Sequence, residues 1–173
     1  MSRNALGFTL IELMVTIAVA AILLTVAVPG FQSLVQNNRA TAAANELSTA
    51  FSFARSEAVT RGEEVSVCPV DDAGGDWHAD GWRVVLGNDC AAPEMADPLR
   101  RWEDISGRVV IDDNIEDQSH LTFGPLGGRE SPGRDDEDDP MFYIHAENCS
   151  GERARDLNIG PGGKVGIVRS DCP

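Results

Sequence analysis

Histidines, cysteines and a cluster of carboxylates are the residues of this chain that could do chemistry. The three histidines, His78, His120 and His145, stand far apart in the sequence. No Ser or Cys nucleophile motif, no H-E-x-x-H pattern and no nucleotide-binding glycine-rich loop accompanies them. We therefore expect a protein that is not an enzyme and that needs no cofactor.

The four cysteines, Cys68, Cys90, Cys149 and Cys172, contain no C-x-x-C pair, which argues against a zinc site. All four follow a long apolar segment that would hold them outside the cytoplasm, where disulfides persist. Three pairings are possible. Proximity in the sequence favours Cys68–Cys90 and Cys149–Cys172.

The carboxylates gather in residues 129–140, which contain six acidic side chains. Calcium binds clustered carboxylates, but the alternation of an EF-hand loop is absent here. We therefore predict a solvated loop in which like charges repel, with a calcium site as the alternative. No metal ligand is assigned.

The whole chain is acidic, with 28 acidic and 14 basic residues and a net charge of −14. Phosphate contacts need concentrated Lys and Arg, so broad nucleic-acid binding is not expected. The length of 173 residues suggests one domain with appendages, and a hydrophobic content of 42% suffices for a core.

The segment from Phe8 to Val28 is apolar apart from one charge, Glu12. Such a helix rises about 30 Å, which is the hydrocarbon thickness of a bilayer. Arg3 precedes the segment and the next basic residue, Arg39, lies well beyond it, which places the N-terminus in the cytoplasm. A carboxylate inside the span costs about 2.5–3.5 kcal/mol and normally has a partner.

The N-terminal residues Gly7-Phe8-Thr9-Leu10-Ile11-Glu12-Leu13 resemble the prepilin peptidase motif of type IV pilins and type II secretion pseudopilins. Gly7 precedes the apolar run, whereas the small residues of a secretory signal follow it. The resemblance implies cleavage between Gly7 and Phe8 on the cytoplasmic side and methylation of the new Phe8 amine. It also implies that Glu12 meets the N-terminal amine of a neighbouring subunit. The alternative is a plain signal anchor.

Beyond the span, the sequence predicts the rest of a helix and then strands. Pro29 should kink or locally open the helix. Apolar residues then recur at i, i+3, i+4 from Phe31 to Ala58, and Gly62 can cap the helix. After Gly62 the period becomes two. Strands are expected at Val65–Cys68, Trp82–Leu86, Val109–Ile111, Leu121–Phe123, Phe142–Ile144, Ala154–Ile159 and Lys164–Val168, in two small antiparallel sheets.

Further motifs narrow the resemblance to the GspH/FimT family of minor pilins and minor pseudopilins. They are Ala54-Arg55-Ser56-Glu57-Ala58, Val65-Ser66-Val67-Cys68-Pro69, Gly81-Trp82, Phe123-Gly124-Pro125-Leu126-Gly127 and Ile159-Gly160-Pro161-Gly162-Gly163-Lys164-Val165. The resemblance implies an α+β pilin fold, in which a long kinked helix packs on a small antiparallel β-sheet domain. The parts would be a cleaved leader (1–7), a transmembrane assembly helix (8–28), its amphipathic continuation (29–61) and an exported β-rich domain (62–173).

The same resemblance implies the partners and the location of the protein. The partners would be other pilins, prepilin peptidase, an inner-membrane assembly platform and membrane lipid. The protein would cross the inner membrane once, with its C-terminal domain in the periplasm, and then join a filament near its tip. A type IV pilus and a type II secretion pseudopilus both stay open.

DNA is the alternative partner. Some FimT-like minor pilins capture DNA through a C-terminal G-R-x-R motif, and Gly163-Lys164-Val165-Gly166 stands at the matching place. The first basic position is kept as Lys164, whereas the second is a glycine. Arg153, Arg155 and Arg169 could flank Lys164, but the acidity of the domain opposes a polyanion. DNA reception therefore ranks below a structural role.

Overall fold

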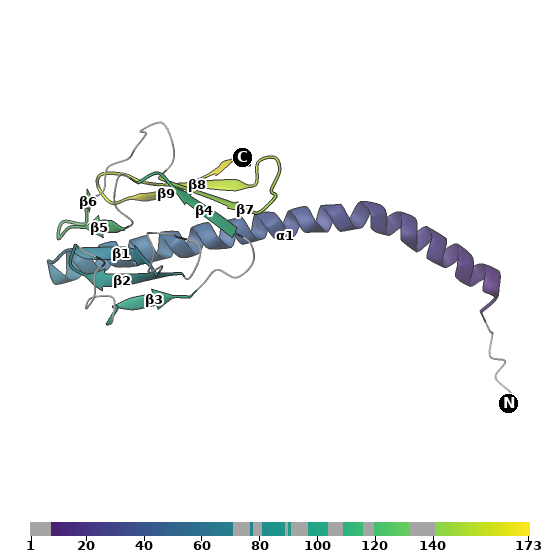
Figure 1. Cartoon of the computed structure of the whole chain (residues 1–173), viewed down its shortest axis with the longest axis horizontal. Helices are drawn as coiled ribbons and strands as arrows, with labels where there is room; N and C mark the ends of the chain where they lie inside the picture. The colour runs from purple at the N-terminus through teal and green to yellow at the C-terminus, as the bar shows by residue number, and fades with distance from the viewer. Residues whose placement is uncertain are drawn as a thin grey trace, which may run out of the picture. The chain divides into compact units, whose positions relative to one another are not determined.

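The chain divides into two compact units, residues Met1–Val35 and Gln36–Pro173. The computed structural model describes residues 8–70, 77, 81–88, 90, 97–103, 109–115, 120–131 and 141–173. One helix, α1 (Leu10–Arg61), belongs to both units, and all strands belong to the second (Figure 1). The helix ends as predicted, because Gly62 has a φ of 71° and donates its N–H to the Ala58 carbonyl at 2.9 Å.

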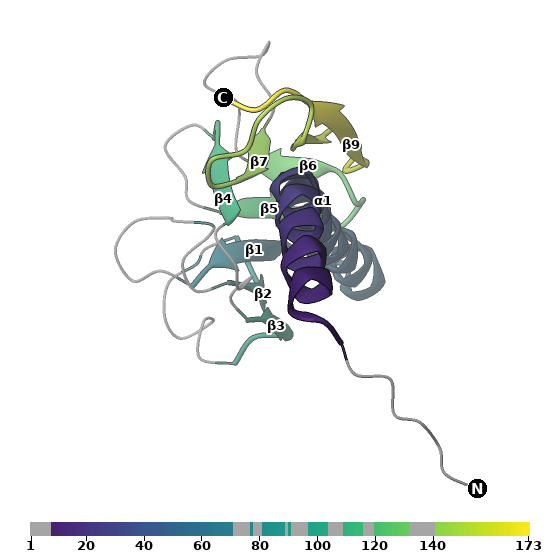
Figure 2. The same ribbon diagram turned by 90° about the vertical axis from the view of Figure 1, so that its right-hand side faces the viewer.

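Two antiparallel sheets form the second unit and lie beside its part of α1 (Figure 2). The first sheet has the strand order β3-β2-β1-β5-β6 and the second β4-β7-β8-β9. The strands are β1 (Val65–Pro69), β2 (Trp82–Leu86), β3 (Arg100–Trp102), β4 (Val109–Asp113), β5 (Leu121–Phe123), β6 (Arg129–Ser131), β7 (Phe142–Ala146), β8 (Ala154–Ile159) and β9 (Val165–Ser170). All seven predicted strands are present, and the predicted α+β pilin-like class is confirmed. The short strands β3 and β6 were not predicted.

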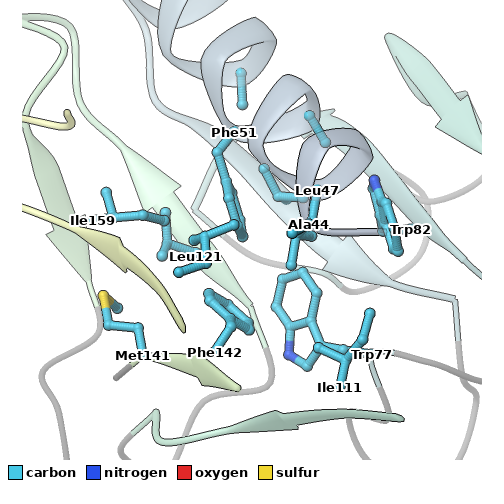
Figure 3. Close-up of a cluster of buried hydrophobic side chains, with 14 of the residues drawn as sticks. Ala44, Leu47, Phe51, Trp77, Trp82, Ile111, Leu121, Met141, Phe142 and Ile159 are labelled. Carbon is cyan, nitrogen blue, oxygen red and sulfur yellow. The ribbon is translucent and has the colours of Figure 1, made fainter. Parts of the chain in front are cut away.

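The core lies between α1 and both sheets, and Phe51 stands at its centre (Figure 3). The Phe51 ring centroid is 5.2 Å from that of Phe142, 5.9 Å from Trp77 and 6.4 Å from Phe123. The helix buries mostly alanines around this ring, and their small side chains let the sheets approach its backbone. The buried helix residues are Ala40, Ala43, Ala44, Leu47, Ala50, Phe51, Ala54 and Ala58.

The predicted apolar stripe of the helix is therefore core only in part. From Ala43 onward its members are buried, as expected. Phe31 and Leu34 are instead exposed and belong to the first unit. The periodicity continues through both parts, so it does not reveal where the core begins.

Two turns of near-identical sequence, one in each sheet, have the same geometry. Gly124–Gly127 joins β5 to β6, and Gly160–Gly163 joins β8 to β9. In each turn the fourth residue donates its N–H to the carbonyl of the first at 2.8 Å. Gly127 and Gly163 have φ angles of 77° and 74°, which favour glycine. We name the two segments the paired turns.

The paired turns meet each other and Arg55. The Arg129 N–H donates to the Pro161 carbonyl at 2.9 Å, which connects the two sheets. Arg55 Nε, on α1, donates to the Gly127 carbonyl at 2.9 Å. A Cβ atom on Gly163 would collide with the Gly127 carbonyl oxygen. Three of the sequence motifs therefore share one junction, which ties both sheets to the helix.

We expect Gly163→Ala to destabilise the second unit by about 2 kcal/mol or more, since it adds left-handed strain and a backbone collision. Gly162→Ala is the matched control, because a Cβ there would meet no atom within 4 Å. Thermal unfolding of the full chain in detergent, followed by tryptophan near-ultraviolet circular dichroism, measures both. The melting temperature should fall by about 5 °C or more for Gly163→Ala only. Equal melting temperatures would contradict the role given to the paired turns.

Candidate functional site

The first unit exposes an apolar helical surface. α1 is long and apolar enough to cross a membrane, and its most apolar window is not buried inside the chain at all. Apolar exposure on this scale marks a membrane or protein interface. The exposed large side chains are Phe8, Leu10, Ile11, Leu13, Met14, Val15, Ile17, Val19, Ile22, Leu23, Leu24, Val26, Val28, Phe31 and Leu34.

Glu12 lies in the first turn of this helix, where Thr9 caps the backbone. The Thr9 carbonyl accepts the Leu13 N–H at 3.1 Å, and Thr9 Oγ1 accepts the Glu12 N–H at 3.3 Å. A threonine followed three residues later by a glutamate is the sequence of a capping box. The backbone of Glu12 is therefore held at the start of the helix. Within the described chain its carboxylate has no ion-pair partner.

The other polar side chains of the apolar segment bond to their own helix. Thr16 Oγ1 donates to the Leu13 carbonyl at 2.8 Å, and Thr25 Oγ1 donates to the Ile22 carbonyl at 2.7 Å. In an apolar environment the polar groups of Thr16 and Thr25 would thus already have a partner.

Helix α1 continues through Pro29 without a break, so the predicted local opening is absent.

Of the two predicted cleavage residues, the structure describes one. Phe8 is exposed and stands two residues before the first helical residue. Gly7 lies outside the described residues.

Both disulfides have the pairing that sequence proximity favours. Cys68 of β1 is bonded to Cys90, and Cys149 to Cys172, at sequence separations of 22 and 23. The second bond holds the C-terminal segment, where the Cys172 N–H also donates to the Gly151 carbonyl at 3.0 Å.

The four candidate DNA contacts do not form one basic surface. Lys164 and Arg169 are exposed, on the β8–β9 turn and on β9. Arg153 is half-buried and donates to Ser150 Oγ at 3.0 Å. Arg155 is buried, and its guanidinium bonds to Asn37 Oδ1 at 2.7 Å, Thr41 Oγ1 at 2.8 Å and the Ala154 carbonyl at 2.7 Å.

Arg155 therefore joins β8 to the helix. Its acceptors among the described residues are the neutral groups of Asn37, Thr41 and Ala154. Burial, and secondarily the positive charge of Arg169, lower the pKa of Arg155 from its ordinary value. Nothing in this arrangement leaves the Arg155 guanidinium available to a phosphate.

Carboxylates also surround the second sheet near these arginines. Burial and then the charges of Asp156, Asp171 and Asp112 raise the pKa of Tyr143, whose hydroxyl donates to the Asp171 carbonyl. A polyanion approaching Arg169 would meet this negative potential.

The histidines take up unrelated positions. His120 Nε2 is 3.0 Å from the Asn88 carbonyl. His145 Nε2 on β7 is 3.3 Å from Asp112 Oδ2 on the neighbouring strand β4 of the second sheet. His78 lies outside the described residues, as do residues 132–140 of the acidic segment. In the part that the structure describes, no group of three or more metal-ligating side chains occurs.

Sequence reasoning overlooked two features. One is the cap made by Thr9, which the threonine–glutamate spacing could have revealed. The other is a stack on β3, where the Arg100 guanidinium carbon lies 4.6 Å from the Trp102 ring centroid and 5.5 Å from that of Phe53. No local pattern indicates this stack, because Phe53 belongs to the helix.

Two segments of the chain match known families. Residues 43–163 match the family described as type II transport protein GspH, and residues 2–28 match the prokaryotic N-terminal methylation motif. None of the curated proteins matches the chain.

Among solved structures, the chain is similar to the type IV minor pilin FimU of Pseudomonas aeruginosa strain PAO1. In its P21 crystal form FimU is 25% identical, with 76% of this chain and 89% of FimU covered at a TM-score of 0.58. In the P65 form it is 26% identical, with 74% and 91% covered at a TM-score of 0.55.

We expect no cysteine of the native full chain to react with a thiol reagent before reduction, because each sulfur is already bonded to its partner. After reduction and unfolding, all four should react. Mass spectrometry counts the labels, and peptide mapping without reductant should join Cys68 to Cys90. Closing each loop should contribute about 2–4 kcal/mol. Two free thiols before reduction would contradict the two-bridge arrangement.

Proposed function

This chain belongs to the GspH family, and from that premise we propose that it is a subunit of a type IV pilus or type II secretion pseudopilus that assembles through α1. The observation that carries the proposal is the exposed apolar helix surface that contains a single, unpartnered carboxylate, Glu12. We further propose a location near the filament tip, where such a subunit would help to start assembly.

Membrane insertion would precede assembly. The apolar segment has the length of a bilayer span, so before assembly the subunit would rest in the inner membrane. Its N-terminus would face the cytoplasm, and the second unit, with both disulfides, would face the periplasm. Prepilin peptidase would cut between Gly7 and Phe8, which leaves the whole helix on the mature chain.

Cleavage would also create the partner of Glu12. The new amine of Phe8 is a cation four residues before Glu12, at the same end of the helix. In a neighbouring subunit shifted along the filament, that amine can approach the Glu12 carboxylate. Two unit charges 4 Å apart attract by about 1 kcal/mol in water and about 4 kcal/mol at an effective dielectric constant of 20. The pair therefore strengthens where water is excluded, which favours docking in register.

DNA reception has weaker support. Of the four basic candidates, Arg155 is occupied by the helix and Arg153 by Ser150. The remaining exposed pair, Lys164 and Arg169, stands in a chain of net charge −14. Duplex DNA should bind weakly at physiological salt.

Processing is tested on protein taken from membranes. Intact-mass measurement should show a chain that begins at methylated Phe8. Gly7→Ala keeps a small residue at the cleavage position and should mature, whereas a bulky charged residue there should block maturation. A mature chain that begins at Met1, or after Val28, would refute the proposal.

Docking is tested with Glu12→Gln, which removes the charge and keeps the size of the side chain. We expect normal synthesis, cleavage and membrane insertion, since the substitution also eases burial in lipid. Recovery in sheared filaments should fall about tenfold relative to wild type, because the attraction to a neighbour's amine is lost. Immunoblots of membrane and filament fractions from the same cells measure both quantities.

Glu46→Gln is the matched control, because Glu46 is an exposed glutamate of the same helix in the second unit. Its recovery in filaments should equal that of wild type. Equal incorporation of Glu12→Gln would show that Glu12 is merely a tolerated charge.

A further inference from the structure

Strand β9 is the last strand of its sheet, and its outer edge is open. It pairs with β8 on one side, and among the described residues no strand pairs with the other side. The Gly160 N–H donates to the Lys164 carbonyl at 3.0 Å, so residues 160 and 164 form a hydrogen-bonded pair. Such pairs alternate along an antiparallel ladder. The backbone groups of Val165, Ile167 and Arg169 therefore point away from β8.

A groove of 580 Å³ lies between the start of β9, at Val165, and helix α1. That volume is within the usual range of ligand pockets. The groove contains two exposed cations, Arg55 and Lys164, and none of its lining residues is acidic, although the chain carries a net charge of −14. On the helix side it presents four hydroxyl groups four residues apart, from Ser48, Ser52, Ser56 and Thr60.

The β8–β9 hairpin contacts helix α1 at both of its ends. At one end, Gly163 contacts Arg55. At the other end, Arg155 of β8, which is paired with Arg169 of β9, bonds to Thr41. From residue 41 to residue 55 the helix rises about 21 Å, and from residue 163 to residue 169 a strand extends about 20 Å, so the two stretches match in length.

We propose that an extended, acidic segment of a partner polypeptide binds here by adding a strand to β9. Its backbone would bond to Val165 and Ile167, and its carboxylates would be drawn to Arg55 and Lys164 at the start of β9, away from the aspartates near Arg169. Main-chain bonds would supply affinity and the cations selectivity. The contact is independent of cleavage and of Glu12, so it goes beyond the assembly role proposed above.

The chemistry of the edge selects this occupant. An open strand edge presents N–H donors and C=O acceptors in alternation, and a peptide backbone offers both complements. A phosphodiester chain has no backbone N–H to give to the carbonyls. A second copy of β9 is disfavoured, since Lys164 and Arg169 of both copies would be brought together, and lysine on an edge opposes self-pairing.

The test measures fluorescence anisotropy of a blocked, labelled peptide of alternating valine and aspartate with the full-length chain in detergent micelles. Two further peptides carry N-methyl groups on alternate amides, in the two possible phases. We expect the parent peptide and one isomer to bind saturably. The other isomer should bind about tenfold more weakly, because its methyl groups replace the donors that face β9.

The charge contribution is tested with Lys164→Glu, which should weaken binding of the parent peptide about tenfold. Arg101→Glu changes the charge equally on β3 of the other sheet, where Arg101 pairs with exposed Glu103, and should alter binding less than about twofold. A single-stranded oligothymidylate should compete poorly.

Four outcomes would overturn the proposal. They are no saturable binding of the parent peptide, equal binding of both methylated isomers, equal losses in Lys164→Glu and Arg101→Glu, and competition by the oligothymidylate as strong as by the peptide. The last would identify a general polyanion site. Because the measurement uses subunits in detergent, its result does not depend on filament assembly.

Discussion

A helix that crosses hydrocarbon must satisfy its backbone within itself, because lipid offers no hydrogen-bond partner. Helix α1 is long and apolar enough to be such a helix, and residues 40–58 of the same continuous helix also form the centre of the core. Its apolar side chains therefore point outward in the first unit and inward in the second. The two parts of the helix differ in the size of their apolar side chains. Leucine, isoleucine and valine dominate the first part, whereas alanine dominates the buried face of the second.

The alanine face determines how the sheets are held. A face of small side chains supplies little apolar area by itself, whereas Phe51 and the aromatic residues packed around it are large and buried. Two polar ties position the sheets on this face. Arg55 bonds to the paired turns near the end of the helix, and Arg155 bonds to Asn37 and Thr41 nearer its middle. Arg155 uses both terminal nitrogens of its guanidinium, whereas Arg55 uses Nε, so the helix is attached to the β-structure at two separate levels.

Most of this architecture could be predicted from sequence because its elements carry local signals. The glycine cap at Gly62 and seven of the described strands were predicted from periodicity and turn chemistry. β3 and β6 were not, since Arg100–Trp102 and Arg129–Ser131 are mostly polar and carry no apolar alternation, and each lies at an edge of the first sheet. The contact between the paired turns is likewise tertiary, although their matching sequences were visible.

Arg155 shows a signal that was available and not used. Arg155, Leu157 and Ile159 alternate along β8, and the two apolar members are buried in the core. The period of two therefore places Arg155 on the inner face, where a lone arginine needs acceptors from the helix. When Arg155 is considered only as one of several basic residues near Lys164, it is predicted to be a possible DNA contact. Whether a charged residue occupies an inward-facing or an outward-facing position of its strand decides between a bond to the helix and a contact with DNA.

The position of Glu12 raises a similar choice, which magnitudes can decide. A carboxylate in the first turn of a helix gains about 0.3–1 kcal/mol from the helix dipole, and Thr9 already caps the Glu12 N–H. Burial of that carboxylate within an apolar span costs about 2.5–3.5 kcal/mol. The dipole alone leaves most of this cost uncompensated, so a capping role does not account for a glutamate at this depth. An amine 4 Å away at an effective dielectric constant of 20 contributes about 4 kcal/mol, which is enough to offset this cost. The chain contains no basic residue between Arg3 and Arg39, so the cation that we propose at this level is the N-terminus that cleavage would expose, supplied by a neighbouring subunit.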